Sequence, residues 1–388
     1  MKNLRNAFCL LVLSLICCKK PFNPTVIAAP NSYLVVEGQI NSGSDSTIIK
    51  LSQTVNLDNA NPVNPVLGAV VTVESDQNNT YPLADLKGDG NYSTAGLNLP
   101  ASQKYRLRIK TGDGHQYLSD FVEVKPTPPI DSIGYIIQND GLQLYVNAHD
   151  PANNTHYYRW EYKETWIFHA KYKSDYVLNA AGDAIVPRDI NKSVYFCFAN
   201  DSSSNILLSS TAKLSQDIVY QSPLTKIPST SEKIEMKYSI LVKQYALTPD
   251  AYSFYTNLKK NTEQLGSIFD AQPSQLVGNI HSVSNVNEPV IGYITATNAQ
   301  SKRIFINYNV LPKTWFPTYP FDCEEDEALF SNSQGYNEVQ NVLIDPPLVY
   351  VPTRASGSPP SITGYYYSRP DCVDCTLRGT TVTPSFWK

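Results

Sequence analysis

Tyr105-Arg106-Leu107-Arg108-Ile109-Lys110 is the stretch that decides the fold of this chain. Apolar and basic side chains alternate along it, so an extended strand would bury one face and expose the other to water. Residues 111–114 (TGDG) are typical of a hairpin turn, and Tyr117 to Val124 return to an extended pattern. The stretch therefore indicates antiparallel strands with one buried face.

Further short strands precede this pair, separated by turns rich in Asn, Asp and Gly. They are expected at Tyr33 to Ile40, Ile48 to Leu51, Gly68 to Glu74 and Thr80 to Leu83. Several short strands over about 90 residues predict a β-sandwich, Ig-like or similar to the carboxypeptidase regulatory-like domain, over residues 33–126. The prolines at 126, 128 and 129 mark the expected end of this domain.

Residues 127–311 are expected to form a larger β-rich domain with one helix near 249–265. The helix prediction rests on Thr248 as the N-cap, on Pro249 at the first helical position and on an apolar i, i+3, i+4, i+7 pattern. Residues 312–388 hold 10 of the 27 prolines and are expected to form a loop-rich segment stapled by cysteines. The fold class is thus mainly β.

The first residues resemble a bacterial lipoprotein signal. Lys2 and Arg5 precede an apolar run that is too short to span a bilayer and that ends at Cys17-Cys18. We expect residues 1–17 to be a signal peptide, Cys18 to carry the lipid, including palmitate, and residues 18–32 to be a tether. Lipidation of Cys17, or an ordinary signal peptide with incidental cysteines, stays open as an alternative.

The charge balance argues against nucleic acid as a partner. The chain has 31 Lys and Arg and 35 Asp and Glu, a formal net charge of −4. Non-specific binding to nucleic acid needs a basic field. Membrane contact is expected only through the lipid, and no cofactor is expected.

Four cysteines remain after Cys18, namely Cys197, Cys323, Cys372 and Cys375. An even number in an oxidising compartment favours disulfides, but four cysteines allow three pairings. The C-x-x-C spacing of Cys372 and Cys375 also fits half of a zinc site or a redox pair. Sequence alone leaves these alternatives open.

The most aromatic stretch runs from Tyr157 to Tyr172. Its Trp160, Trp166, Tyr158 and Tyr162 are the candidate binding surface, because exposed aromatic side chains stack on ligands or anchor partners. Strand alternation predicts that half of the aromatics in this stretch fill a core instead.

No familiar catalytic motif is present, neither a G-x-S-x-G elbow nor a P-loop nor an H-E-x-x-H pair. Glu161 and Glu164 lie three apart in a strand and so point to opposite faces, a poor acid–base pair. We therefore expect a binding protein and no enzyme. The alternative is a hydrolase or metal-dependent enzyme with an unrecognised site, for which His149 and His156 are candidate ligands.

Several strings together resemble the Bacteroidota lipoprotein family catalogued as domain of unknown function 4249. They are YLVVEGQIN, PPIDSIGY, YYRWEYKETW, YSILVKQYALTPDAY, LKKNTEQLGSIFDAQPSQLVGNIH, VIGY, RIFI, CVDC, RGT and FW, from Tyr33 to Trp387. The family has no established activity. The resemblance implies a lipid-anchored outer-membrane protein that is an accessory or ligand-binding partner of a TonB-dependent transporter. Lys19-Lys20-Pro21 differs from the acidic start typical of surface-exported lipoproteins, so the surface and periplasmic faces both stay open.

Overall fold

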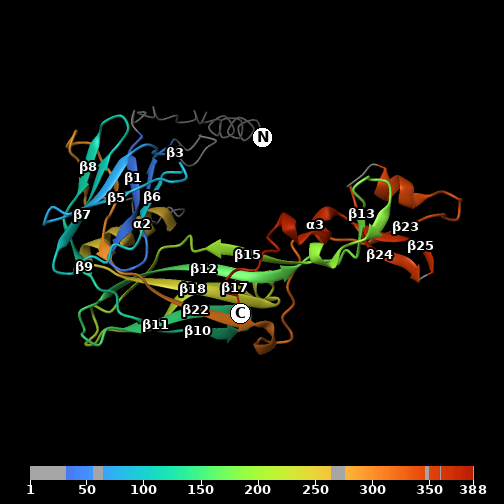
Figure 1. The fold of residues 1–388 in the computed structure, drawn as a ribbon. Coiled ribbons are helices and arrows are strands. Elements are labelled where there is room, and N and C mark those ends of the chain that lie inside the picture. The colour runs from blue at the N-terminus through green and yellow to red at the C-terminus, as the bar shows by residue number, and fades with distance from the viewer. Residues whose placement is uncertain (1–31, 56–63, 264–275, 346–348, 359, 388) are drawn as a thin grey trace, which may run out of the picture.

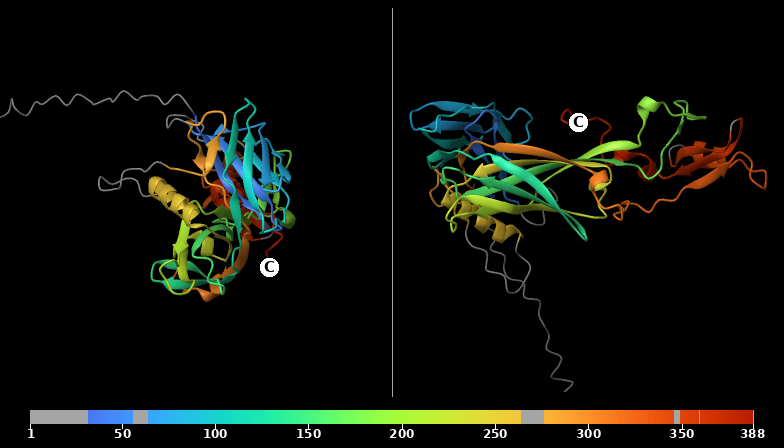
Figure 2. Two further views of the ribbon diagram at one scale, coloured as in Figure 1. Left: turned by 90° about the vertical axis from the view of Figure 1, so that its left-hand side faces the viewer. Right: turned by 90° about the horizontal axis from the view of Figure 1, so that it is seen from below.

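The computed structural model describes residues 32–55, 64–263, 276–345, 349–358 and 360–387. The expected mainly β fold is confirmed. Three β modules form an elongated molecule: an N-terminal sandwich whose 12 strands are linked into one sheet around a core, a central sandwich and a distal module (Figures 1 and 2). The expected signal peptide, Cys18 and the tether up to residue 31 lie outside the described residues.

The N-terminal sandwich is built from the alternating strands that the sequence predicts. Tyr105, Leu107 and Ile109 are fully buried, while the arginines between them lie on the outer face. Arg106 and Arg108 both pair there with Glu74 on the neighbouring strand. Its strands are β1 (Leu34–Asn41), β2 (Thr47–Gln53), β3 (Asn64–Pro65), β4 (Val70–Ser75), β5 (Thr80–Leu83), β6 (Asn91–Thr94), β7 (Lys104–Lys110), β8 (Gln116–Ser119) and β9 (Val122–Lys125).

A later segment of the chain completes this sandwich. The strand β19 (Ile280–Ser282) pairs with β8, and β20 (Ile291–Gly292) pairs in parallel with β1. The strand β21 (Ala296–Thr297) lies between β1 and β9 and joins them. The sequence predicts contiguous domains at 33–126 and 127–311, whereas the strand pairing places β19, β20 and β21 with the N-terminal strands. A short strand in the sequence shows its own faces but not its partner, which explains the difference.

The central sandwich packs a three-stranded sheet against a five-stranded one around a single apolar core. The first sheet contains β10 (Ile130–Gln138), β11 (Gly141–His149) and β17 (Ile218–Pro228). The second contains β12 (Tyr157–His169), β15 (Phe196–Ser202), β16 (Leu207–Ser210), β18 (Lys237–Ala246) and β22 (Gln300–Asn307). Short 3-10 turns lie at η1 (Ile190–Lys192), η2 (Glu232–Ile234) and η3 (Tyr308–Val310).

The expected helix is α2 (Pro249–Glu263). The Thr248 hydroxyl accepts a hydrogen bond from the Ala251 amide at 3.3 Å, as an N-cap does. Ala251 and Phe254 are buried, so the apolar stripe packs inward as the spacing predicts. The last two positions of the expected range 249–265 lie outside the described residues.

The distal module is a small three-stranded sheet that projects from the central sandwich (Figure 1). Its strands are β23 (Asp326–Leu329), β24 (Val351–Ser358) and β25 (Ser361–Ser368), with a π-helical turn at η4 (Val339–Ile344). A hairpin of β13 (Tyr176–Leu178) and β14 (Ile185–Pro187) packs beside them, although its chain comes from between β12 and β15. The Asp175 amide donates to the Thr353 carbonyl at 2.7 Å. This module is therefore also assembled from two distant segments.

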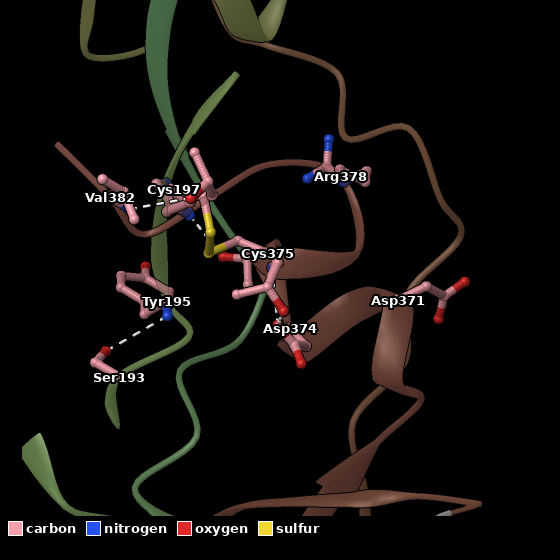
Figure 3. The surroundings of a disulfide bond; sticks show 12 residues. Ser193, Tyr195, Cys197, Asp371, Asp374, Cys375, Arg378 and Val382 are labelled. Carbon is pink, nitrogen blue, oxygen red and sulfur yellow. Dashed lines mark hydrogen bonds between the residues drawn. A yellow bond between two sulfur atoms is a disulfide. The ribbon is translucent and has the colours of Figure 1, made fainter. Parts of the chain in front are cut away.

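The four cysteines form two disulfides, Cys323–Cys372 and Cys197–Cys375. The C-x-x-C pair is thus split. Cys372 lies in α3 (Pro370–Val373) and Cys375 begins η5 (Cys375–Leu377), which the second disulfide fixes to β15 (Figure 3). Of the alternatives that the sequence leaves open, the structure shows the disulfides.

Candidate functional site

The candidate site is a cleft between the N-terminal and central sandwiches. Two adjoining cavities, of about 450 Å³ and about 630 Å³, share Gly38 of β1, Arg159 and Glu161 of β12, and residues 204–206. The larger one is also bordered by α2 and by β20. Cavities of this size are typical of sites for small ligands.

Arg159 lies where the two cavities meet. Its Nη1 donates to Glu161 Oε1 at 2.6 Å, and its Nη2 donates to Gln39 Oε1 of the other sandwich at 3.2 Å. The guanidinium lies over the rings of Tyr245 and Tyr255, with its carbon 4.8 and 4.9 Å from the ring centroids. Its Nε is buried and has no hydrogen-bond partner among the described residues. This side chain therefore links the two sandwiches directly.

The electrostatics of the cleft keep Arg159 and Tyr245 protonated. Burial alone would lower the pKa of Arg159, but Tyr255, Glu161 and Tyr245 outweigh it and raise that pKa. Burial, followed by the nearby Glu161 carboxylate, raises the pKa of the Tyr245 phenol. That phenol therefore keeps its proton and donates to Glu161 Oε2 at 3.1 Å. The cleft contains a fixed ion pair framed by two tyrosines.

Two glycines on the N-terminal side of the cleft allow the strands to approach. Gly38 has φ +130°, and a Cβ there would lie 2.3 Å from the Ile48 carbonyl oxygen. Gly292 has φ +154°, and its Cβ would lie 2.4 Å from the Val36 carbonyl oxygen. Such contacts are far below any normal van der Waals distance, so both positions require glycine.

The aromatic surface expected from the sequence is largely a core. Tyr158, Trp160 and Trp166 are only 0%, 1% and 8% exposed, which corrects that expectation. The Trp160 indole donates to Gln244 Oε1 at 2.9 Å, and Tyr158 donates to the buried Asp217. Their partners are internal, because these rings point between the two sheets of the central sandwich. Of the four, only Tyr162 is half-buried, and it too packs against the core of the central sandwich. Tyr162 and Trp160 both line part of the smaller cavity.

Arg159 and Gln39 are not among the residues expected at the site from the sequence, and Glu161 is expected there only as half of a poor acid–base pair. The available signal was the alternation within the aromatic stretch itself. Since Trp160 faces inward, its neighbours Arg159 and Glu161 on β12 must face outward, toward the cleft. Glu164 does point to the opposite side, where it is buried and pairs with Lys233 at 2.6 Å.

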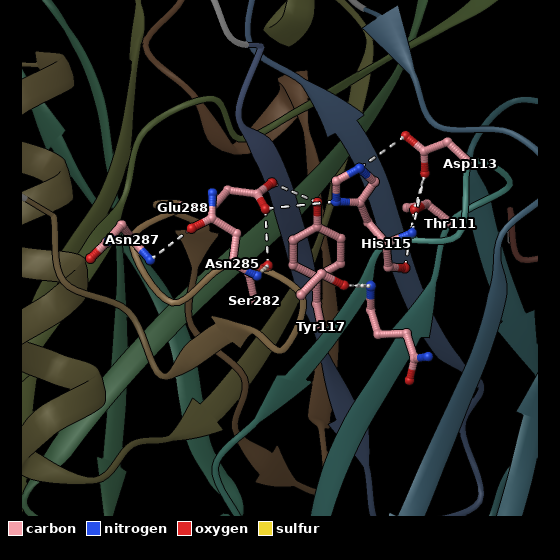
Figure 4. A network of polar contacts seen from close by, with 10 residues as sticks. Thr111, Asp113, His115, Tyr117, Ser282, Asn285, Asn287 and Glu288 are labelled. Carbon is pink, nitrogen blue, oxygen red and sulfur yellow. Dashed lines mark hydrogen bonds and ion pairs between the residues drawn. The ribbon is translucent and has the colours of Figure 1, made fainter.

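A third, more polar cavity of about 660 Å³ lies at the other end of the N-terminal sandwich. Figure 4 shows the polar side chains that border it, among them Thr111, His115 and Glu288. There Glu288 accepts hydrogen bonds from Tyr117 at 2.6 Å and from Ser282 at 2.9 Å. The His115 ring lies 3.9 Å from both Asp113 and Glu288. Most polar groups of this cluster already have partners within it.

The candidate metal ligands stay apart in the part of the chain that the structure describes. The four cysteines are used in disulfides, and His149 pairs with Asp131 at 2.8 Å, whereas His156 contacts Thr211. Within the described ranges, no group of three or more His, Cys, Asp or Glu side chains could hold a metal ion. Among the same residues, no helix is long and apolar enough to cross a membrane.

Comparison with known proteins shows a family and includes a remote structural likeness. No curated protein matches the chain. A solved structure of a proposed carbohydrate binding protein from Bacteroides uniformis ATCC 8492 is 11% identical and aligns over 56% of this chain and 91% of its own. Its TM-score is 0.12, which is too low to carry an argument about fold or function.

The family match covers the cleft. The sequence model described as Domain of unknown function (DUF4249) matches residues 19–303. This range includes every element that borders the cleft and excludes β23–β25 of the distal module, as well as the strings CVDC, RGT and FW and all but the first residue of RIFI. The match extends over most of the sequence, so the chain belongs to the family defined by domain of unknown function 4249.

Proposed function

We propose that this protein is a non-catalytic, lipid-anchored protein of the cell envelope that holds a ligand in the cleft and acts as the partner of a TonB-dependent outer-membrane transporter. The observation that carries the proposal is the cleft itself. It combines ligand-sized cavities with a fixed set of polar and aromatic side chains. Cys18 would supply the membrane anchor.

The strings that carry the family resemblance support the cleft as the site. Gly38 and Gln39 belong to YLVVEGQIN, Arg159 and Glu161 to YYRWEYKETW, and Tyr245 to YSILVKQYALTPDAY. They come from parts of the chain more than 200 residues apart and border the same cavity. A binding site shared by the family would produce this convergence.

The partner is tested by purifying the tagged full chain from gently solubilised outer membranes and identifying co-purifying proteins by mass spectrometry. Stoichiometric recovery of a TonB-dependent transporter is the expected result. An unrelated outer-membrane lipoprotein with the same tag is the control and should recover none. Recovery of the protein alone, at expression levels where the transporter is present, would contradict the partnership.

A further inference from the structure

The charges around the cleft balance one another. Its lining has three basic side chains, Arg159, Lys163 and Lys243, and three acidic ones, Glu37, Glu161 and Glu263. Within the lining, Glu161 pairs with Arg159 at 2.6 Å, and the three positive and three negative formal charges cancel. A charged ligand would gain no net attraction from such a lining.

Uncharged hydrogen-bonding groups are available where the two cavities meet. Ser204 and Asn205 are exposed, border both cavities, and have no side-chain hydrogen bond among the described residues. Gln39 uses its carbonyl oxygen on Arg159 at 3.2 Å, which leaves its amide nitrogen free to donate within the described structure. Together they present both donors and acceptors without charge.

Aromatic rings border the larger cavity beside these groups. Tyr255 of α2 and Tyr293, which follows β20, are both half-buried. Tyr293 is braced by Phe254, with 5.4 Å between the ring centroids. Braced rings at a cavity wall offer flat apolar contact to a ligand while losing little conformational freedom.

We infer that the cleft binds a neutral oligosaccharide, an inference that rests on the proposed ligand-holding role of the cleft. A sugar presents hydroxyls that both donate and accept, alongside flat C–H faces that pack on aromatic rings. The planar Arg159, Glu161 and Asn205 groups suit neighbouring hydroxyls, and the tyrosines suit the C–H faces. Charge balance disfavours uronic acids and charged peptides.

The test is calorimetric titration of the purified full chain, in mild detergent, with short neutral gluco-, manno-, xylo- and galacto-oligosaccharides. Oligogalacturonates and short peptides form the comparison arms. At least one neutral sugar should bind. The double variant Ser204→Ala/Asn205→Ala should then weaken its affinity about tenfold, from the loss of two hydrogen bonds. Tyr255→Ala should weaken it by a similar factor.

The matched control is Ser215→Ala/Gln216→Ala, an exposed pair that borders none of the three cavities described above. It should bind the sugar as the unmodified protein does. Binding of oligogalacturonates or peptides in place of neutral sugars would overturn the inference, and so would wild-type sugar affinity in the Ser204/Asn205 variant. If the transporter is recovered but no neutral sugar binds, only the ligand class is wrong. If a neutral sugar binds and no transporter is recovered, the partnership fails instead.

Discussion

Cys197 in β15 and Cys375 in η5 form a disulfide between residues 178 positions apart. This bond holds the C-terminal segment on the central sandwich, where Trp387 also packs against Phe198 with ring centroids 5.0 Å apart. Cys197→Ala/Cys375→Ala should lower the free energy of unfolding by about 4 kcal/mol, since such a long loop is then free in the unfolded chain. Urea denaturation measures the change, and an unaltered midpoint would contradict a stabilising role.

Trp160→Ala should destabilise the central sandwich by about 3–5 kcal/mol. The change leaves a cavity at a fully buried site and removes the hydrogen-bond donor of the buried Gln244 Oε1. Thermal unfolding followed by circular dichroism checks this. Tyr220→Ala is the control, since Tyr220 is 74% exposed and its removal should leave the stability almost unchanged. Equal stability of the two variants would show that Trp160 is not a core residue.

Glu161→Gln should lower the free energy of unfolding by about 1–2 kcal/mol. Arg159 would remain charged and largely buried but would lose the carboxylate with which it pairs. Glu161 itself is partly exposed, which keeps the cost below that of a fully buried pair. Glu123→Gln removes the carboxylate of a surface pair with Lys104 and should have little effect. Urea titrations of both variants would reveal the difference, and equal midpoints would count against it.

His169 should make stability depend on pH. Its Nε2 lies 2.9 Å from Glu235, and that contact, opposed by burial, raises the pKa of His169 above its ordinary value near 6.5. Because the folded pKa is the higher one, the stabilisation is complete below 6.5 and is lost as pH rises through the folded pKa. Unfolding midpoints measured from pH 5.5 to 8.5 should therefore fall in the unmodified protein.

The His169→Gln variant should show a flatter dependence over the same pH range. His281→Gln, a change at an exposed histidine, provides the matched control and should keep the original slope. The same slope in His169→Gln and the unmodified protein would rule out His169 as its source.

Cys18→Ala should abolish metabolic labelling with radioactive palmitate and release the protein from the membrane fraction, because one residue is expected to carry the anchor. Cys17→Ala should retain both. Labelling that survives in Cys18→Ala and is lost in Cys17→Ala would move the lipid to the neighbouring cysteine.

Local patterns predicted local structure well. The alternation around Leu107 gave the buried face of β7, and Thr248 with Pro249 gave the start of α2. Alternation also implied that part of the aromatic stretch on β12 would be core, and the structure places Trp160 there. These features depend on backbone periodicity and on capping by neighbours, both of which are visible within a few residues.

Such local patterns do not predict contacts between residues far apart in the sequence. Nothing near Cys372 or Cys375 indicates that one pairs with Cys323 and the other with Cys197. Arg159 and Gln39 are 120 residues apart, so the cleft exists only once both sandwiches have formed. Sheet partners are chosen by packing between distant strands, which a single sequence does not display.

The return of residues 280–297 to the N-terminal sandwich also sets an order of events during synthesis. β1 and β9 are made early, but β21, which lies between them, is made only after the chain has passed through most of the central sandwich. Until then β1 has an unpaired edge, the kind of surface on which chains aggregate. The module that is translated first is therefore among the last to close, and a fragment ending at residue 126 would lack the strands that seal it.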